Sequence, residues 1–469
     1  MSKYYLAIDI GASSGRHILG YMQDGIMQLE EVYRFSNGMK DMDGSKCWDA
    51  DQLFADIKAG MKKCAEIGKV PVSVSVDTWG VDFILLDKDG KRLGNAVGYR
   101  DSRTKGMDEE VYKYIDADAL YARTGIQKQL YNTIYQLMAV KLKQPELLEQ
   151  AETLLMTPDY YHYMLTGKKA AEYTICTTGQ LVSPVTKDWD YELIEMLGYP
   201  KHIFPEMKKP GTILGNLTEE VQKEVGYDCQ VVMAAGHDTA SAVMAVPSMG
   251  LDSVYISSGT WSLMGVELPE ANCSALSQKA NLTNEGGYNY RYRFLKNIMG
   301  LWMIQSVRHE YDDKYSFAEL CAMAEEVKDF PSRVDVNDDS FFAPDSMIQA
   351  IQDYCAAAGQ PVPQTPGEIS TVVYQSLADS YGETVKEIEE ITGKSYDAIN
   401  IVGGGSNADY LNQLTANSTG KTVYAGPNEA TAIGNLVAQM IDFDEFADLE
   451  AARKNIFKSF AVKTFEPQA

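Results

Sequence analysis

Residues 7–16 read AIDIGASSGR, and this stretch decides the fold. The run from Tyr4 to Ile10 is apolar apart from Asp9 and predicts a buried strand, the small residues 11–15 predict a turn, and residues 17–22 predict a returning strand. Residues 251–266 repeat this plan, with a strand at 253–256, the turn SSGT at 257–260 and a second strand at 261–266. Two similar hairpins, one opening each half of the chain, indicate a duplicated architecture.

Helices and strands alternate around both hairpins. The sequence predicts helices at 51–67, 318–327, 366–391 and 409–416, helix-rich sequence at 107–165, and strands at 70–77, 81–87, 230–235 and 398–402. Such alternation favours α/β sheets with helices on both faces. The Pro/Gly punctuation at Pro247-Ser248-Met249-Gly250 predicts the main boundary, which gives segments 1–246 and 247–445 and a C-terminal helix and tail at 446–469.

The bulk composition narrows the class of protein. A net charge of -24 over 469 residues argues against binding to nucleic acid or to anionic membranes, because phosphates are repelled. Seven cysteines without C-x-x-C spacing argue against a zinc site and favour reduced thiols. No run of about 18 apolar residues and no signal-peptide pattern is present, so we expect a cytoplasmic protein without a membrane span.

The turn in AIDIGASSGR suits a site for a metal and a nucleotide. Its small residues let backbone N–H groups approach phosphate oxygens, and Ser13, Ser14 and Arg16 add donors. Asp9, at the strand end, is placed to hold Mg²⁺ through water. The alternative is an ordinary Gly-Ser hairpin turn, and the acid inside a buried strand favours the functional interpretation.

Two further stretches admit a functional and a structural interpretation. In IVGGGSNADYLNQL (401–414), three glycines between a strand and a helix let a flat ligand lie on the backbone, or they form a tight turn. In VDTWGVDFILLD (76–87), Trp79 beside Gly80 forms either a wall for a sugar ring or part of a core.

Residues 234–242 read AAGHDTASA, which leaves Asp238 among residues with almost no side chain. One interpretation is a helix start, since Asp and Thr are favoured there. The other is that a substrate lies against the carboxylate. The two interpretations are compatible.

The motif series as a whole resembles the FGGY family of carbohydrate kinases, within the larger group that has the actin/Hsp70/hexokinase ATPase fold. The residues that carry the resemblance are spread from 9 to 414: DIGASSGR, DTWGVDFILLD, YRDSRT, YNTIYQL, TPDYYHYMLTG, AGHDTASAV, SSGTWSLMG, KNIMGLW and IVGGGSNADYLNQL. The resemblance implies an α/β fold of two duplicated ribonuclease-H-like (actin-like ATPase) domains with a central cleft.

The resemblance also implies roles for individual residues. Asp238 matches the general base, and Asp9 matches the acid on the metal side. The nucleotide contacts implied are Ala12, Ser13, Ser14, Gly15, Arg16, Thr260, Gln305 and Gly404, and the sugar contacts are Gly80, His237, Thr239 and Asn297. The N-terminal segment is thereby assigned the sugar, the first phosphate loop and the base, and segment 247–445 is assigned the nucleotide.

The expected activity is transfer of a phosphoryl group from ATP, with Mg²⁺, to O1 of a ketose, L-rhamnulose, by a monomer or homodimer. One alternative is another ketose or polyol of the same class, such as L-fuculose or L-xylulose. The other is a chaperone-like or filament-forming ATPase of the same fold. No β-rich extension that would bind peptides is visible, which argues against a chaperone, and a filament former would polymerise with ATP.

Overall fold

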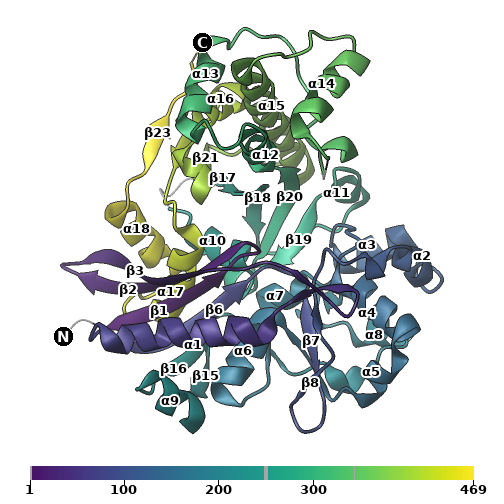
Figure 1. Ribbon diagram of the computed structural model, residues 1–469, viewed down its shortest axis with the longest axis vertical. Helices are drawn as coiled ribbons and strands as arrows, with labels where there is room; N and C mark the ends of the chain where they lie inside the picture. Colours follow the sequence, from purple (N-terminus) through teal and green to yellow (C-terminus); the bar gives the residue numbers. More distant parts are fainter. Residues whose placement is uncertain (1–2, 248–251, 343, 469) are drawn as a thin grey trace. The chain divides into compact units, whose positions relative to one another are not determined.

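The computed structural model describes residues 3–247, 252–342 and 344–468 (Figure 1). The chain forms two compact units. The first comprises Met1–Ala245, Glu267–Phe294 and Thr431–Ser459, and the second comprises Val246–Val266, Leu295–Ala430 and Phe460–Ala469. Of the stretch predicted to carry the main boundary, Pro247 is described, whereas Ser248, Met249 and Gly250 lie outside the described residues.

The first unit is built on a six-stranded sheet with the order β15-β16-β6-β1-β2-β3. β1 pairs antiparallel with β2 and parallel with β6, β2 pairs antiparallel with β3, β6 pairs parallel with β16, and β15 is antiparallel to β16. The strands are β1 (Tyr4–Ile10), β2 (Ser14–Gln23), β3 (Ile26–Ser36), β6 (Pro71–Thr78), β15 (Thr212–Asn216) and β16 (Gln230–Met233).

Helices cover both faces of this sheet. On one face, Leu53 and Ile57 of α1 (Ala50–Glu66) join the core that holds Leu6, Ile8 and Val74. On the other face, Asn435 and Gln439 of α17 (Ala430–Asp442) bond to Asp77, Ser73 and the Leu6 carbonyl. Strand side chains alternate between faces, so Ser73, Ser75 and Asp77 of β6 lie toward α17.

The first unit also holds a second core, around α4 (Thr133–Lys143) and β10 (Thr153–Met156). Its further helices are α2 (Met107–Val111), α3 (Ala117–Thr124), α5 (Pro145–Gln150), α6 (Thr157–Thr166), α7 (Tyr173–Thr177), α8 (Tyr191–Met196), α9 (Glu219–Val225), α10 (Asp238–Met244), α11 (Ala275–Lys279) and α18 (Leu449–Ser459). Its short strands are β4 (Lys40–Met42), β5 (Ser45–Trp48), β7 (Phe83–Leu86), β8 (Arg92–Leu93), β9 (Ala96–Val97), β11 (Ala171–Glu172), β12 (Val182–Ser183), β13 (Asp188–Trp189), β14 (Met207–Lys208) and β19 (Thr283–Gly286).

The second unit contains a run of strands in the order β20-β18-β17-β21-β22-β23. β17 pairs antiparallel with β18 and parallel with β21, β21 pairs parallel with β22, and β23 is antiparallel to β22. The strands are β17 (Ser253–Ser258), β18 (Trp261–Leu268), β20 (Tyr292–Met299), β21 (Ala398–Val402), β22 (Thr422–Ala425) and β23 (Lys463–Phe465). The helices are α12 (Trp302–Glu310), α13 (Phe317–Glu326), α14 (Met347–Ala357), α15 (Pro366–Thr392) and α16 (Asp409–Thr419).

The two units repeat one topology. The series β3-β2-β1-β6-β16-β15 corresponds to β20-β18-β17-β21-β22-β23, with a central antiparallel hairpin, two parallel neighbours and an antiparallel edge. The duplication inferred from the two hairpins is therefore confirmed. The start of one strand differs from the prediction. β2 begins at Ser14 rather than at residue 17, and Gly15 pairs with Ile10. The predicted loop residues Ser14, Gly15 and Arg16 thus lie on a strand.

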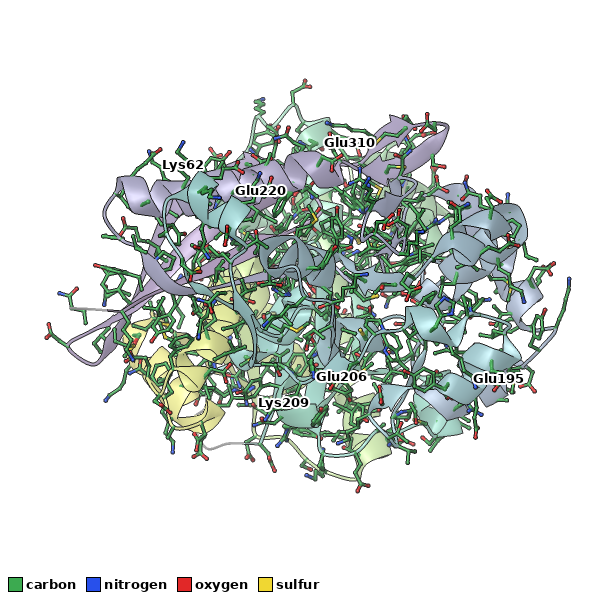
Figure 2. The ribbon with its side chains drawn as sticks, turned by 90° about the horizontal axis from the view of Figure 1, so that it is seen from below. Lys62, Glu195, Glu206, Lys209, Glu220 and Glu310 are labelled. Atoms are coloured by element: carbon green, nitrogen blue, oxygen red, sulfur yellow. The ribbon has the colours of Figure 1, made fainter. Side chains whose placement is uncertain are left out.

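Charged side chains of the first unit are exposed on its surface. Figure 2 shows Lys62 and Glu195 pointing outward from the ribbon, and Glu195, Glu206 and Glu220 are all exposed. Within the described residues, no helix combines the length and the apolar character needed to cross a membrane.

Candidate active site

The predicted phosphate loop is the tight turn between β1 and β2. Ala12 and Ser13 are exposed at its tip, and the Gly11 N–H closes the turn on the Ser14 carbonyl at 2.9 Å. Asn37 holds the turn from outside, because its side-chain amide donates to the Gly11 carbonyl and its backbone N–H to the Ser13 carbonyl. Gly15 admits no side chain, since an added Cβ would lie 2.1 Å from the ring of Phe35.

Two carboxylates lie side by side behind this turn. Asp9 and Asp77 are register partners on the parallel strands β1 and β6, so their side chains leave the same face of the sheet. Arg16 donates to Asp9 Oδ2 from Nε at 3.0 Å and from Nη2 at 2.8 Å. Asn435 donates to Asp77 Oδ2 at 2.6 Å, whereas Asp77 Oδ1 is buried and has no hydrogen-bond partner in the part of the chain that the structure describes. Burial, together with the charge of Asp9, raises the pKa of Asp77 well above its ordinary value.

This pair fits a magnesium ion. Mg²⁺ is usually held by one or two carboxylates, and substrate phosphates and water complete its shell. Asp77 Oδ1 is an acceptor without a donor, and the mutual repulsion of two buried acids is relieved by a cation. Within the described ranges, no cluster of three His, Cys, Asp or Glu side chains forms a complete metal site. These residues therefore fit a magnesium site whose remaining ligands come from the phosphates of ATP.

Asp238 is the first residue of α10, which follows β16. Its Oδ1 accepts from the Thr239 N–H at 2.5 Å and from Thr239 Oγ1 at 3.1 Å, and it lies 3.4 Å from His237 Nε2. No donor among the described residues contacts Oδ2. The helix cap itself is His237, and no side chain caps the helix. Asp238 therefore starts the helix, as predicted, while one carboxylate oxygen remains open for a ligand.

The backbone before Asp238 is fixed by buried groups. The Thr78 N–H donates to the Gly236 carbonyl at 2.9 Å, which joins the end of β6 to this segment. Glu172 Oε2 accepts from the Gly236 N–H at 2.9 Å and from Thr174 Oγ1 at 2.6 Å. Burial raises the pKa of Glu172 to about 6, and its hydrogen bonds oppose that rise. The segment that carries His237 and Asp238 is consequently held on both sides.

Gly80 lies in a strained turn after β6. Val81 adopts φ +67°, which is unfavourable for a β-branched residue. Thr178 Oγ1 accepts from the Val81 N–H at 3.0 Å, and the Val81 carbonyl accepts from Thr133 Oγ1 at 2.7 Å. Because Val81 is left-handed, the strand predicted at 81–87 begins only at Phe83. A strained backbone conformation that neighbouring groups hold in place is characteristic of functional sites.

Trp79 belongs to the core. It is 7% exposed, its ring centroid lies 4.0 Å from that of Trp48, and both indole N–H groups donate to Asp82 Oδ2. Asp82 also accepts from the Tyr99 N–H and from Gln136, so its carboxylate is saturated. The interpretation of Trp79 as an open wall for a sugar ring is wrong, since the indole is buried and its N–H donates to Asp82.

In the second unit, three predicted nucleotide contacts lie around one end of β17. Thr260 is exposed in the β17–β18 turn, whose carbonyls at 259 and 260 accept from the N–H groups of Leu301 and Trp302 at the start of α12. Gln305 lies on α12. Gly404 begins the 3-10 turn Gly404–Asn407, where a Cβ on Gly405 would lie 1.9 Å from Ser258 Oγ. The fourth predicted residue of this unit, Asn297, lies half-buried on β20.

Sequence reasoning missed several residues of the first unit. Asp77 stood inside a quoted motif, and the shared pattern of an acid at each strand end is a signal that could have found it. No such signal marks four other residues. Long-range packing places Asn37 beside the turn, Asn435 beside Asp77, and Glu285 and Arg293 beside His237.

Two family models match the chain. The N-terminal domain of the FGGY family of carbohydrate kinases matches residues 4–245, and the C-terminal domain matches residues 254–443. The chain is 52% identical to a rhamnulokinase of Halalkalibacterium halodurans over 462 residues, which cover 98% of both chains. It is 43% identical to a rhamnulokinase of Bacillus subtilis, with coverage of 99% of this chain and 95% of the relative.

Solved structures share the fold at low identity. A xylulose kinase from Rhodospirillum rubrum matches with a TM-score of 0.81 and 16% identity over 99% of this chain and 94% of that one. A Plasmodium falciparum glycerol kinase solved with ADP matches with a TM-score of 0.80 and 14% identity, covering 100% and 94%. With both family models matched and relatives this similar along nearly its full length, the chain belongs to the FGGY family of carbohydrate kinases.

Proposed function

We propose that this chain transfers the γ-phosphoryl group of ATP to O1 of L-rhamnulose. Support comes from full-length relatives named rhamnulokinase. The observation that carries the chemistry is Asp238, whose Oδ1 is occupied by Thr239 while Oδ2 has no donor among the described residues. A carboxylate with one oxygen engaged and one open is suited to accept a proton from a hydroxyl.

In the proposed reaction, Asp238 Oδ2 accepts the proton of the O1 hydroxyl. The O1 oxygen forms a bond to the γ-phosphorus, and the bond from that phosphorus to the β–γ bridging oxygen breaks, so that ADP leaves. Phosphoryl transfer of this kind depends on in-line positioning and charge stabilisation. The proposed sugar contacts are Gly80, His237, Thr239 and Asn297.

The proposed nucleotide contacts are Ala12, Ser13, Ser14, Gly15, Arg16, Thr260, Gln305 and Gly404. Asp9 and Asp77 would hold Mg²⁺, which supplies charge neutralisation for the phosphate oxygens when bound. Segment 1–246 would thus carry the sugar site and the base, segment 247–445 the nucleotide site, and segment 446–469 a C-terminal helix and tail. We further propose a cytoplasmic monomer or homodimer.

The direct test is an ADP-release assay of the full chain with ATP and Mg²⁺ over a panel of sugars. The panel holds L-rhamnulose, L-fuculose, L-xylulose, D-xylulose, glycerol and gluconate. We expect the highest kcat/KM for L-rhamnulose, with the product phosphorylated at O1 by ³¹P NMR. A higher kcat/KM for any other member would contradict the substrate assignment, and phosphorylation at another oxygen would contradict the position of the base. Family membership argues against a chaperone-like or filament-forming ATPase. ADP release in the absence of sugar would favour that alternative.

A further inference from the structure

A buried ion pair lies behind His237 in the first unit. Arg293, at the start of β20, is fully buried, and its Nη2 lies 3.0 Å from Glu285 Oε2 on β19. The same Nη2 lies 2.9 Å from His237 Nδ1, and Arg293 Nε donates to the Gly286 carbonyl at 2.9 Å. A buried arginine is costly unless its charge and its N–H groups are matched, so its place beside the predicted base requires an explanation.

The contact between Arg293 and His237 determines where the imidazole proton resides. A guanidinium has only donors, so a ring nitrogen 2.9 Å from Nη2 must accept with its lone pair. Nδ1 is then unprotonated, and the single proton of the neutral ring is on Nε2. That nitrogen lies 3.4 Å from Asp238 Oδ1, on the side of the carboxylate that also accepts from Thr239.

Glu285 completes the arrangement. Its Oε2 lies 3.3 Å from His237 Nδ1 and 3.0 Å from the same Nη2, an ion pair without hydrogen-bond geometry among the described residues. Burial opposes the ionisation of Glu285, and the charge of Arg293 opposes burial, so that the pKa of Glu285 lies below its ordinary value. Arg293 and Glu285 together carry no net charge, so they orient the ring without adding charge next to Asp238.

We propose that Arg293, whose charge Glu285 balances, is a positioning residue that holds His237 in the Nε2–H tautomer, with Nε2 beside Asp238 Oδ1. The proposal rests on the proposed function in taking Asp238 as the base. Oδ1 is then occupied by the two Thr239 donors and has Nε2 beside it, and the open Oδ2 is the oxygen that accepts the substrate proton. In the opposite tautomer, the Nδ1 proton would meet the guanidinium, and two lone pairs would face each other between Nε2 and Asp238.

Few other groups act on His237. The charged side chains that face it are Arg293, Glu285 and Asp238, and Thr174 Oγ1 accepts from its backbone N–H at 3.3 Å. Glu172 acts one residue earlier, through the Gly236 N–H. Arg293 is therefore the only cation that an interaction in the described residues places on the ring.

The first test is ¹⁵N NMR of the ring nitrogens in the full chain labelled in histidine. The chain has five histidines, so His237→Gln assigns the resonances by loss. We expect a neutral ring with a protonated Nε2 and an unprotonated Nδ1 between pH 6 and 8. Arg293→Met removes the donor and leaves Glu285 as an acceptor, so Nδ1 should become protonated. A protonated Nδ1 in the wild-type protein would overturn the proposal, whether or not the variant folds.

The second test is a double-mutant cycle on turnover. We expect Arg293→Met to lower kcat about 10- to 100-fold, the range for coupled neighbours, with little change in the KM for ATP. In the His237→Gln background, the same substitution should change kcat by less than about 3-fold, because the tautomer no longer exists. Equal losses in both backgrounds would mean that Arg293 acts only on structure. The NMR result does not depend on turnover, so a failed base assignment for Asp238 remains distinguishable from a failed tautomer assignment.

Discussion

Asp77 and Asp9 lie opposite each other on parallel strands, and their chemistry differs although their residue type does not. Arg16 neutralises Asp9, whereas Asp77 receives one amide donor from Asn435 and keeps a buried, unpartnered oxygen. The sequence predicted Asp9 on the metal side from its place before the turn. Asp77 also lies at the end of a predicted strand, but only the register of β1 against β6 shows that it lies beside Asp9.

This difference gives a prediction for Asp77→Asn. The substitution keeps the shape and removes a buried charge whose pKa is raised by burial and by Asp9. Without Mg²⁺, we expect the free energy of unfolding to rise by about 0.5–2 kcal/mol, a gain in stability at the expense of function. We expect kcat to fall by at least about 100-fold with a higher Mg²⁺ requirement.

Thermal denaturation and the ADP-release assay measure the two effects. Asp24→Asn, at an exposed turn, is the matched control and should change neither quantity. Lower stability together with full activity in Asp77→Asn would contradict the assigned role.

Some helices and strands are marked by a pattern in their own sequence, and others are not. Ala398–Val402 was predicted with the bounds that the structure shows, and α15 begins at Pro366 because Thr365 and Glu368 form a capping box. α17 was not predicted. Its residues are apolar or small on nearly every side and include Gly434, which lowers helix propensity. It is stabilised by burial against the sheet of the first unit, which no local pattern reports.

Gly434 tests this explanation of α17. A Cβ at this position would lie 1.7 Å from the backbone carbonyl oxygen of Ser241, in the helix that begins at Asp238. A backbone atom cannot rotate away, so Gly434→Ala should lower the free energy of unfolding by at least about 3 kcal/mol. Denaturant titration measures the loss, and Gly38→Ala, where a Cβ meets nothing within 4 Å, should be nearly neutral. A neutral Gly434→Ala would show that α17 packs differently.

At the scale of the whole chain, the duplicated pattern predicts that there are two units but not the course that the chain takes between them. Two hairpins were enough to predict two α/β units, and the repeated strand order confirms that prediction. The tertiary course of the chain could not be predicted, since residues 267–294 and 431–459 return to the first unit after the chain has entered the second. The positioning pair Glu285 and Arg293 lies in one of these returning segments, which is why the sequence around AAGHDTASA did not reveal it.

Acid stability depends on two buried histidines. Burial lowers the pKa of His17 to about 4 and that of His162 to about 3. A lowered pKa means that the unfolded chain binds protons first, so stability is full above the unfolded value near 6.5 and falls as pH drops toward these values. We expect a loss of about 1.4 kcal/mol per pH unit and histidine between about pH 6 and 4.

His162→Gln isolates one of these protons. Nε2 of His162 accepts from the Val76 N–H at 3.0 Å, and a glutamine oxygen can replace this acceptor without titrating. Calorimetry between pH 4 and 7.5 should therefore show a shallower acid slope in the variant. An unchanged slope would mean that His162 does not contribute to acid unfolding.

The most direct measurement concerns Asp238 itself. Asp238→Asn retains the shape and the contacts of Oδ1 but replaces the basic carboxylate by an amide. Assayed with L-rhamnulose, ATP and Mg²⁺, the variant should lose at least about 100-fold in kcat while ATP binding by calorimetry is unchanged. Turnover close to that of the wild-type protein would contradict the assignment of Asp238 as the general base.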